Sequence, residues 1–458
     1  MNDTFVGLQI GAISFLDEGV EETLDKVQSL GGVNALMVGA LSWSRGNAGR
    51  AEDGFPDHGV AEPDELKGGA FFSPDQRYYT GTTIKDFTAP DELYGGFDTL
   101  ADVIPEARKR GIAVYPYYCE TAGSSIRPIW QPGFATVLEV DASGSVGTRP
   151  CQRNPDYRAW WSGVINNWFS EYDLEGLLWG IERQGPLESL LDGDVATCFC
   201  RYCREAGHQR GIDAERAAEG YRRVSTFLCA AASGSERPRD GYLITFMRLL
   251  SQYPEISQWE NLWHDAHVSM YRSVYGQVKY HSSELQVGMH VWQKIDTFSP
   301  WLRAQHDPGE LRGYADWVKP VLYNVPAGFR FKGYLDRLCK TVLGDAPAEE
   351  WAPILYQILG LDEASYDKVP EAGFGAGYVR GETARYVAAV GPETRVYPGL
   401  GVGVEPGARN VSPKDVETMV EAAFAGGGSG VVISRNYSEL MLENLEAVGT
   451  TLRNLGRI

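Results

Sequence analysis

Two glutamates follow apolar segments of the sequence, where they could carry acid–base chemistry. Glu182 comes directly after residues 174–181, and Glu405 comes directly after residues 395–404. Hydrolysis of a glycosidic bond uses a pair of carboxyl groups, one that donates a proton and one that is ionised. Glu120, which follows a third apolar segment, is a rival for the second carboxyl group. The spacing therefore predicts a carboxylate pair centred on Glu182.

Other polar and aromatic residues fall near the ends of apolar segments or in loops, and they are predicted to line the same cleft. The tryptophans among them are candidates for stacking against the apolar faces of sugar rings. For each residue a purely structural role is the alternative, and for Arg183 that role would be an ion pair with Glu182. The predicted set is Trp43, His58, Glu120, Trp179, Arg183, His290, Trp292, Tyr323, Asn324, Arg435 and Tyr437.

One lysine suggests a different reaction. Lys319 lies within the apolar segment 315–323, and a buried lysine could form a Schiff base with a carbonyl substrate. It stands about four residues before the segment ends. Because barrel active sites form at strand ends, this position disfavours an aldolase.

Three cysteines are crowded into one short segment, at positions 198, 200 and 203. Structural zinc takes four ligands in a tetrahedron, and closely spaced thiolates supply three of them. Cys151 is the first choice for the fourth ligand, and Cys119 is the second. The alternative is a group of reduced cysteines without metal. Seven cysteines in total, an odd number, do not form a disulfide framework and favour a reducing cytosol.

The elements that position these residues are eight continuous apolar segments, most of them followed by an amphipathic helical pattern. Continuous apolar segments are typical of parallel strands buried on both faces. Eight strand–helix repeats predict an α/β fold of the closed (β/α)8 (TIM) barrel type, with an open doubly wound sheet as the alternative. The segments are 5–13, 33–41, 111–118, 174–181, 285–292, 315–323, 395–404 and 430–434.

The spacing between these segments is uneven. Long insertions are predicted at about 42–96, 183–284 and 324–394, each after a strand. Loops after strands belong to the carboxyl-terminal face, where barrel enzymes build their active sites. We expect residues 1–458 to form one barrel domain, elaborated on that face.

The net charge of −19 argues against nucleic acid or an anionic membrane surface as a partner. The amino-terminal residues lack the pattern of a secretory signal peptide, and no apolar segment is long enough to span a membrane. These features predict a cytoplasmic protein.

Four local motifs resemble the glycosyl hydrolase families related to the family-42 β-galactosidases of clan A. They are the stretch CQRNPDYR from Cys151, the sequence WGIE that ends at Glu182, the cysteine segment 198–203, and HVWQ followed by DWVKPVLYN. The resemblance implies that Cys151, Cys198, Cys200 and Cys203 bind zinc, that Glu182 is the acid/base residue, and that the chain forms a homo-oligomer. Ile181 stands where that family has an asparagine.

These observations predict a glycoside hydrolase that cleaves a small or imported oligosaccharide without an organic cofactor. A retaining mechanism is expected, with Glu182 as acid/base and Glu405 as nucleophile, about 5–5.5 Å apart. One alternative is a sugar or sugar-acid isomerase or lyase, whose metal site could begin with His290 and Glu182. The other is a carbohydrate-binding barrel without catalysis.

Overall fold

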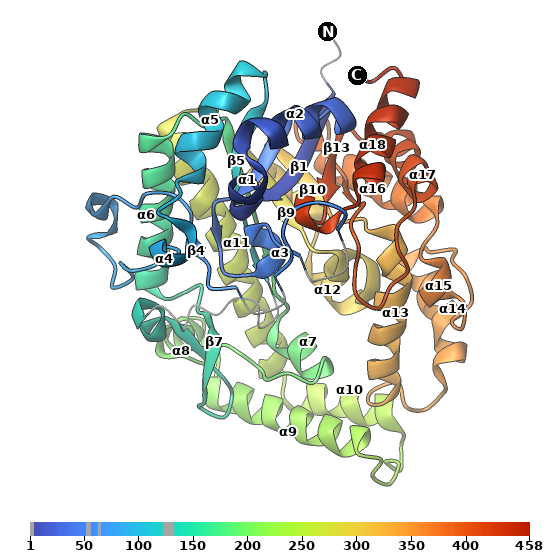
Figure 1. Ribbon diagram of the computed structural model, residues 1–458. Helices are drawn as coiled ribbons and strands as arrows, with labels where there is room; N and C mark the ends of the chain where they lie inside the picture. The colour runs from blue at the N-terminus through green and yellow to red at the C-terminus, as the bar shows by residue number, and fades with distance from the viewer. Residues whose placement is uncertain (1–3, 52–55, 63–65, 122–131) are drawn as a thin grey trace.

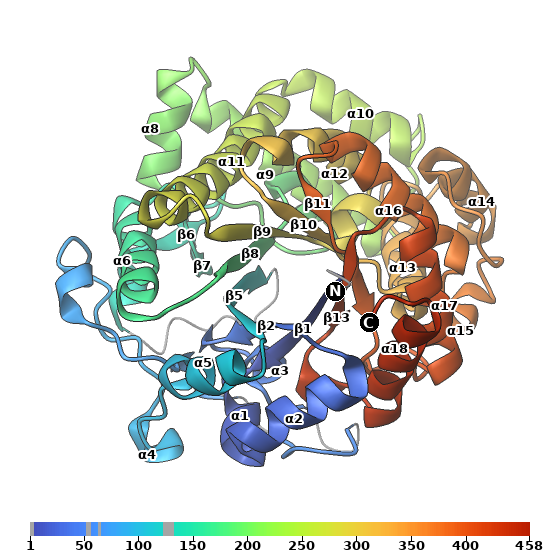
Figure 2. The same cartoon turned by 90° about the horizontal axis from the view of Figure 1, so that it is seen from above.

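The computed structural model describes residues 4–51, 56–62, 66–121 and 132–458, without the side chains of Arg45, Glu120, Thr121 and Asp296. A parallel sheet forms the centre of the molecule, and helices surround it (Figure 2). The order of the hydrogen-bonded strands is β11-β10-β9-β8-β5-β2-β1-β13-β12. A further bridge between Val321 and Gly399 joins the end of β10 to β12, so that the sheet closes on itself.

The nine strands occupy eight positions around the barrel, because β11 and β12 are two parts of one interrupted strand. Each of the eight apolar segments forms one of these positions, which confirms the predicted α/β barrel. The strands are β1 (Phe5–Gly11), β2 (Ala35–Gly39), β5 (Ala113–Thr121), β8 (Gly176–Glu182), β9 (Gln286–Val291), β10 (Trp317–Pro320), β11 (Arg395–Val396), β12 (Gly399–Gly401) and β13 (Gly430–Ser434).

Helices cover the outside of the barrel and connect successive strands (Figures 1 and 2). The last of them, α18 (Leu442–Asn454), follows the last strand and packs against α2 and α17. The outer helices are α1 (Ala12–Glu18), α2 (Val20–Gly31), α5 (Thr99–Lys109), α6 (Pro155–Glu171), α11 (Glu255–His281), α12 (Pro300–Gln305), α16 (Ala376–Val390), α17 (Pro413–Ala425) and α18 (Leu442–Asn454).

The insertions extend the carboxyl-terminal end of the barrel, opposite the two termini in Figure 1. The first holds the antiparallel pair β3 (Leu41–Ser42) and β4 (Gly69–Ala70), and a further insertion after β5, outside the three predicted ranges, holds the antiparallel pair β6 (Leu138–Val140) and β7 (Val146–Pro150). Their helices are α3 (Arg45–Ala48), α4 (Asp91–Tyr94), α7 (Pro186–Leu191), α8 (Arg201–Gln209), α9 (Ala214–Ala232), α10 (Tyr242–Gln252), α13 (Asn324–Cys339), α14 (Ala348–Leu359) and α15 (Val369–Ala372).

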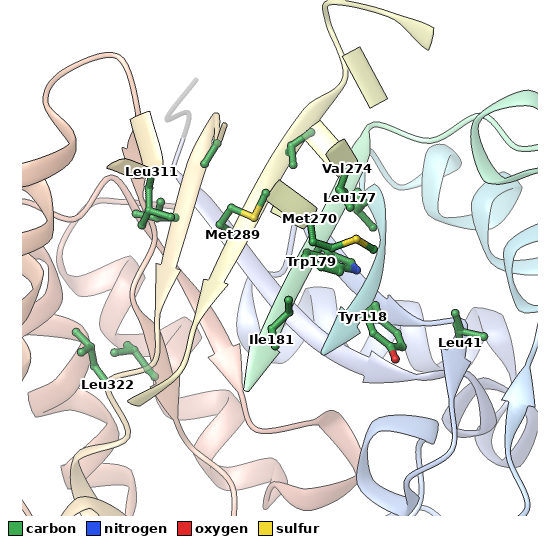
Figure 3. Packing of buried hydrophobic residues seen from close by; sticks show 14 of the residues in the cluster. Leu41, Tyr118, Leu177, Trp179, Ile181, Met270, Val274, Met289, Leu311 and Leu322 are labelled. Atoms are coloured by element: carbon green, nitrogen blue, oxygen red, sulfur yellow. The ribbon is translucent and has the colours of Figure 1, made fainter. Parts of the chain in front are cut away.

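Alternate residues of each strand face either the helices or the barrel interior. Figure 3 shows Leu177, Trp179 and Ile181 of β8 on the side of Met270 and Val274, which belong to α11. Leu178, between them in sequence, packs inside the barrel. By the same alternation Glu182 faces the interior at the carboxyl end of β8.

The interior changes in character along the barrel axis. At the amino-terminal end it is filled by aromatic rings, with centroids 4.2 Å apart for Phe5 and Tyr397 and 6.0 Å apart for Tyr115 and Trp317. Further along, the inward-facing residues become polar. Among the described residues the barrel interior is therefore filled at its amino-terminal end, and the polar part lies toward the carboxyl-terminal face.

A buried glutamate ties the α7 insertion to the barrel helices. Glu260 of α11 accepts hydrogen bonds from the backbone of Leu187 at 2.7 Å and from the hydroxyl of Tyr221 at 2.6 Å. Gln305 of α12 donates to its other oxygen at 3.4 Å. Burial raises the pKa of Glu260 to about 7, against the lowering effect of these hydrogen bonds.

This shift predicts a pH-dependent stability that Glu260→Gln removes. Between its ordinary pKa of 4.5 and about 7, the folded protein holds the Glu260 proton and the unfolded chain does not. Stability should therefore fall as pH rises through this window, by about 3 kcal/mol for this group. Urea unfolding of parent and variant at pH 5 and pH 8 measures the difference. Parallel pH curves for the two proteins would contradict the assignment.

Candidate active site and cysteine cluster

A cavity of about 820 Å³ opens at the carboxyl-terminal end of the barrel. Five of the predicted site residues line it, and each lies on a barrel strand or just after one. This volume falls in the range of ligand-binding cavities. The five residues are Glu182, His290, Trp292, Tyr323 and Arg435.

Glu182 begins a hydrogen-bonded chain through the barrel interior. Its Oε1 lies 2.7 Å from Nε2 of His290 on β9. Nδ1 of His290 lies 3.3 Å from Nζ of Lys319 on β10, and this amine also donates to Oε1 of Gln9 on β1. Ser434, at the end of β13, donates to the same Gln9 oxygen at 2.6 Å. The chain links five strands that are far apart in sequence.

Two glycines make room for this chain. A Cβ atom at Gly180 would lie 2.5 Å from Cβ of His290, and one at Gly399 would lie 2.4 Å from Cε of Lys319. Both distances are too short for a real contact, so larger residues at these inward-facing positions would displace the histidine or the lysine.

The electrostatics of the chain favour an ionised Glu182. Burial raises the pKa of Glu182, but the His290 hydrogen bond and the charges of Arg330 and Lys319 outweigh it and lower the pKa. Burial lowers the pKa of Lys319 to about 7, against the nearby Cys119 and Glu182. Burial and the Lys319 charge also lower the pKa of His290. At neutral pH the site therefore holds a carboxylate beside a neutral imidazole.

The contacts of His290 also bear on metal binding. Ligand atoms of Cys119, Glu182 and His290 lie within 4.8 Å of one another, as the metal-dependent isomerase alternative requires. Lys319 donates to Nδ1 of His290, so we assign the ring hydrogen to Nε2, where Glu182 accepts it. A protonated ring nitrogen has no lone pair for a metal. This arrangement favours acid–base chemistry.

Glu405 lies after β12, beside the cavity wall. Arg330 of α13 binds both of its oxygens, with 2.9 Å between Nε and Oε1, and Arg435 lies 3.4 Å from Oε2. The two arginines line the cavity, as do Val404 and Pro406, but Glu405 is not among the lining residues. Glu405 is therefore connected to the cavity indirectly, through the two arginines that bind its carboxylate and line the cavity.

Two predicted stacking positions are corrected. Trp179 is completely buried and packs against Trp161 and Tyr271, with centroids 5.7 and 5.2 Å away. Trp43 is 5% exposed and packs edge-on against Phe134 at 5.5 Å. Both rings face the helices or loops and not the cavity, so neither can stack on a ligand there. Trp292 remains the predicted tryptophan that lines the cavity.

Arg183 also points away from the cavity. It is the residue next to Glu182, and side chains of neighbouring residues in an extended chain point to opposite sides. Its guanidinium pairs with Glu139 at 2.5 Å and donates to the carbonyl of Pro150 at 2.9 Å. Both the predicted contact with substrate and the alternative ion pair with Glu182 are therefore wrong. Arg183 instead holds the β6–β7 hairpin against the end of β8.

His58 and Tyr437 form a separate buried group. His58 contacts Glu18 at 2.9 Å and the carbonyl of Leu440 at 3.1 Å, and Tyr437 donates to Glu18 at 3.0 Å. Neither lines the cavity, nor does Asn324, which begins α13. The prediction that these three contact substrate is corrected.

The side chain of Glu120 lies outside the part of the chain that the structure describes. Its backbone belongs to β5 and pairs with Ile181 of β8.

Sequence analysis missed Gln9 and Arg330, and it considered Lys319 only for a Schiff base, which the position of this residue disfavoured. Gln9 is a polar residue in an otherwise apolar strand, a signal that could have marked it. The predicted segment 315–323 put Lys319 about four residues before the strand end. In the structure β10 is only four residues long and ends at Pro320, the residue after Lys319. Arg330 lies within a helix, and no sequence pattern marks it.

The four predicted zinc ligands converge. The sulfur atoms of Cys151, Cys198, Cys200 and Cys203 lie within 4.8 Å of one another, and all four residues are buried. Cys151 Sγ is 3.7 Å from that of Cys203 and 3.5 Å from that of Cys200. Zinc bonds of about 2.3 Å in a tetrahedron require about 3.8 Å between sulfurs. The spacing fits a four-thiolate metal site. Cys119, the second choice for the fourth ligand, lies instead beside Glu182.

Three solved structures with a similar fold are glycoside hydrolases. The β-galactosidases of the psychrophilic Marinomonas ef1 and of the Antarctic haloarchaeon Halorubrum lacusprofundi superpose with TM-scores of 0.53 and 0.54, at 11% and 13% identity. Each match covers 99% of this chain, which spans 60% and 58% of their lengths. The PgaB (BpsB) glycoside hydrolase domain of Bordetella bronchiseptica gives 0.51 at 10% identity, covering 99% of this chain and 98% of that domain.

These comparisons confirm, at the level of fold, the predicted resemblance to barrel glycoside hydrolases. Comparison of the sequence with protein-family models and with curated proteins finds no match. None of the described helices is both long and apolar enough to cross a membrane.

Proposed function

We propose that the protein hydrolyses a glycosidic bond in an oligosaccharide, with Glu182 as the acid/base residue. The observation that carries this proposal is the position of Glu182, at the carboxyl end of the fourth barrel strand, in a cavity closed at its base by aromatic rings. The hydrogen bond from His290 gives its carboxylate a neighbour that can deliver a proton. The fold of the structural neighbours supports the same reaction class.

Glu405 is the proposed nucleophile of a retaining mechanism. Arg330 and Arg435 provide the positive surroundings that an ionised carboxylate needs. Each carboxylate oxygen keeps a free lone pair beside these contacts, but Glu405 does not line the cavity, so attack on the sugar requires that its side chain turn toward the cavity when substrate binds. Inversion would need no such movement, since a water molecule would attack in place of Glu405.

Cys151, Cys198, Cys200 and Cys203 are proposed to hold a structural zinc ion. Bound there, zinc would join the loop after β7 to the start of α8 without contributing to catalysis, since four thiolates leave no open position. Seven cysteines without a disulfide support the cytosol as the compartment.

A screen of aryl α- and β-glycosides and oligosaccharides tests the proposal. We expect turnover of at least one glycoside without added divalent metal, since the chemistry depends on carboxyl groups. NMR of the first-formed anomer of the product then reports the mechanism: retention supports Glu405 as nucleophile, and inversion removes it from that role. A parent protein that turns over no member of the panel but binds oligosaccharide would favour the non-catalytic alternative.

A further inference from the structure

Lys319 is a buried cation whose role the proposed reaction does not yet explain. Its side chain is completely buried, and it does not line the cavity, whereas Gln9, His290 and Glu182 do. It therefore cannot contact a substrate in this arrangement. Its influence on the reaction has to pass through the groups that it contacts.

The immediate partners of Lys319 are neutral. Its amine contacts Oε1 of Gln9 and Nδ1 of His290, and among the described side chains no carboxylate lies within ion-pairing distance of it. Burying an ammonium group without an ion pair carries a large desolvation cost, so the group loses its proton more readily than an exposed lysine. A lysine that gives up its proton easily can serve as a proton donor.

We propose that Lys319 is the proton reserve for Glu182, and that His290 conducts the proton between them. This inference rests on the proposed glycosidase function. As the glycosidic bond breaks, its electron pair passes to the leaving oxygen, which takes a proton delivered through Glu182, a carboxylate in the resting site. His290 gives its Nε2 proton to Glu182 and takes a proton on Nδ1 from Lys319, which becomes neutral. When water attacks in the second step, its proton returns to Lys319 along the same path.

The relay resolves a conflict within the site. An acid catalyst has to hold a proton, yet the surroundings of Glu182 lower its pKa and favour the ionised form. Lys319, with a pKa of about 7, can hold that proton near neutral pH and lies only one imidazole ring away. In this way the resting site stays ionised at Glu182 while a proton remains within reach.

The charged and titratable groups around Lys319 set the direction of its pH dependence. Cys119 and Glu182 favour the charged amine, burial opposes it, and the ring of Tyr323 lies 5.9 Å from Nζ. Below about pH 7 the amine carries its proton, and above about pH 7 it has lost it. The rate of hydrolysis should therefore fall above about pH 7, as Lys319 loses the proton that it supplies to Glu182.

The test compares Lys319→Met and Lys319→Gln with the parent protein on two aryl glycosides. A 4-methoxyphenyl glycoside needs protonation of its leaving group, and a 2,4-dinitrophenyl glycoside does not. We expect both variants to lose about 100-fold in kcat/KM on the first substrate and less than about threefold on the second. In both variants the alkaline limb of the pH profile on the first substrate should move to lower pH than in the parent.

The glutamine variant separates proton supply from positioning, because its amide can still donate to Nδ1 of His290 but cannot transfer a proton. Parent-like rates and pH profile in Lys319→Gln would overturn the relay, while a parent that hydrolyses neither glycoside would instead refute the proposed function. Nitrogen-15 NMR of the parent gives a readout that does not depend on folding of a variant, with His290 assigned through His290→Gln. A resting His290 protonated on Nδ1 and not on Nε2 would also overturn the proposal.

Discussion

Glu182→Gln should lower kcat/KM on a glycoside with a poor leaving group by about 1,000-fold or more. Glutamine has the same shape and still offers an oxygen to Nε2 of His290, so the hydrogen bond of 2.7 Å can persist. What the substitution removes is the proton that the leaving oxygen needs and the base that later activates water. Because both chemical steps depend on Glu182, both should slow.

Steady-state kinetics on the substrate found in the glycoside screen measure this effect. Glu284→Gln, an exposed glutamate just before β9, is the matched control and should retain parent activity. Thermal unfolding of Glu182→Gln should resemble that of the parent, which would separate loss of chemistry from loss of fold. A folded Glu182→Gln protein with less than about a tenfold loss would exclude Glu182 as acid/base residue.

Cys203→Ser should abolish metal binding and loosen the cysteine-linked insertion. We expect the purified parent to contain about one zinc per chain and the variant less than about a tenth of that, since three ligands hold structural zinc poorly. The four sulfurs come from two segments, Cys151 after β7 and residues 198–203 before and within α8. Without the metal these segments lose the coordination bonds that join them.

Metal analysis gives the zinc content, and hydrogen exchange locates the loosened region. Exchange should rise in β6, β7, α8 and α9 and remain near parent values in the outer helices α17 and α18. Cys229→Ser, an exposed cysteine on α9, is the matched control and should keep its zinc. A parent protein that contains no metal after purification in zinc-containing medium, and that is unchanged by Cys203→Ser, would show that the cluster is four reduced cysteines.

The sequence by itself determined the strand positions of the barrel. Strands in a parallel barrel are buried on both faces, so each appears as a continuous apolar segment, and all eight segments form strands. It also determined that Glu182 ends a strand, and the tight spacing of Cys198, Cys200 and Cys203 indicated the cysteine cluster. These features depend on residues close together in the chain.

The tertiary structure alone decided which side of each strand faces the cavity. A continuous apolar segment shows no alternation, so sequence analysis could not separate Glu182, which faces inward, from Trp179 and Arg183, which face outward. Sequence analysis could not predict contacts between distant residues either. Lys319 contacts Gln9, 310 residues away in the sequence, only because the barrel closes. The candidate proton path depends on that closure, since its groups come from strands that become neighbours only in the folded barrel.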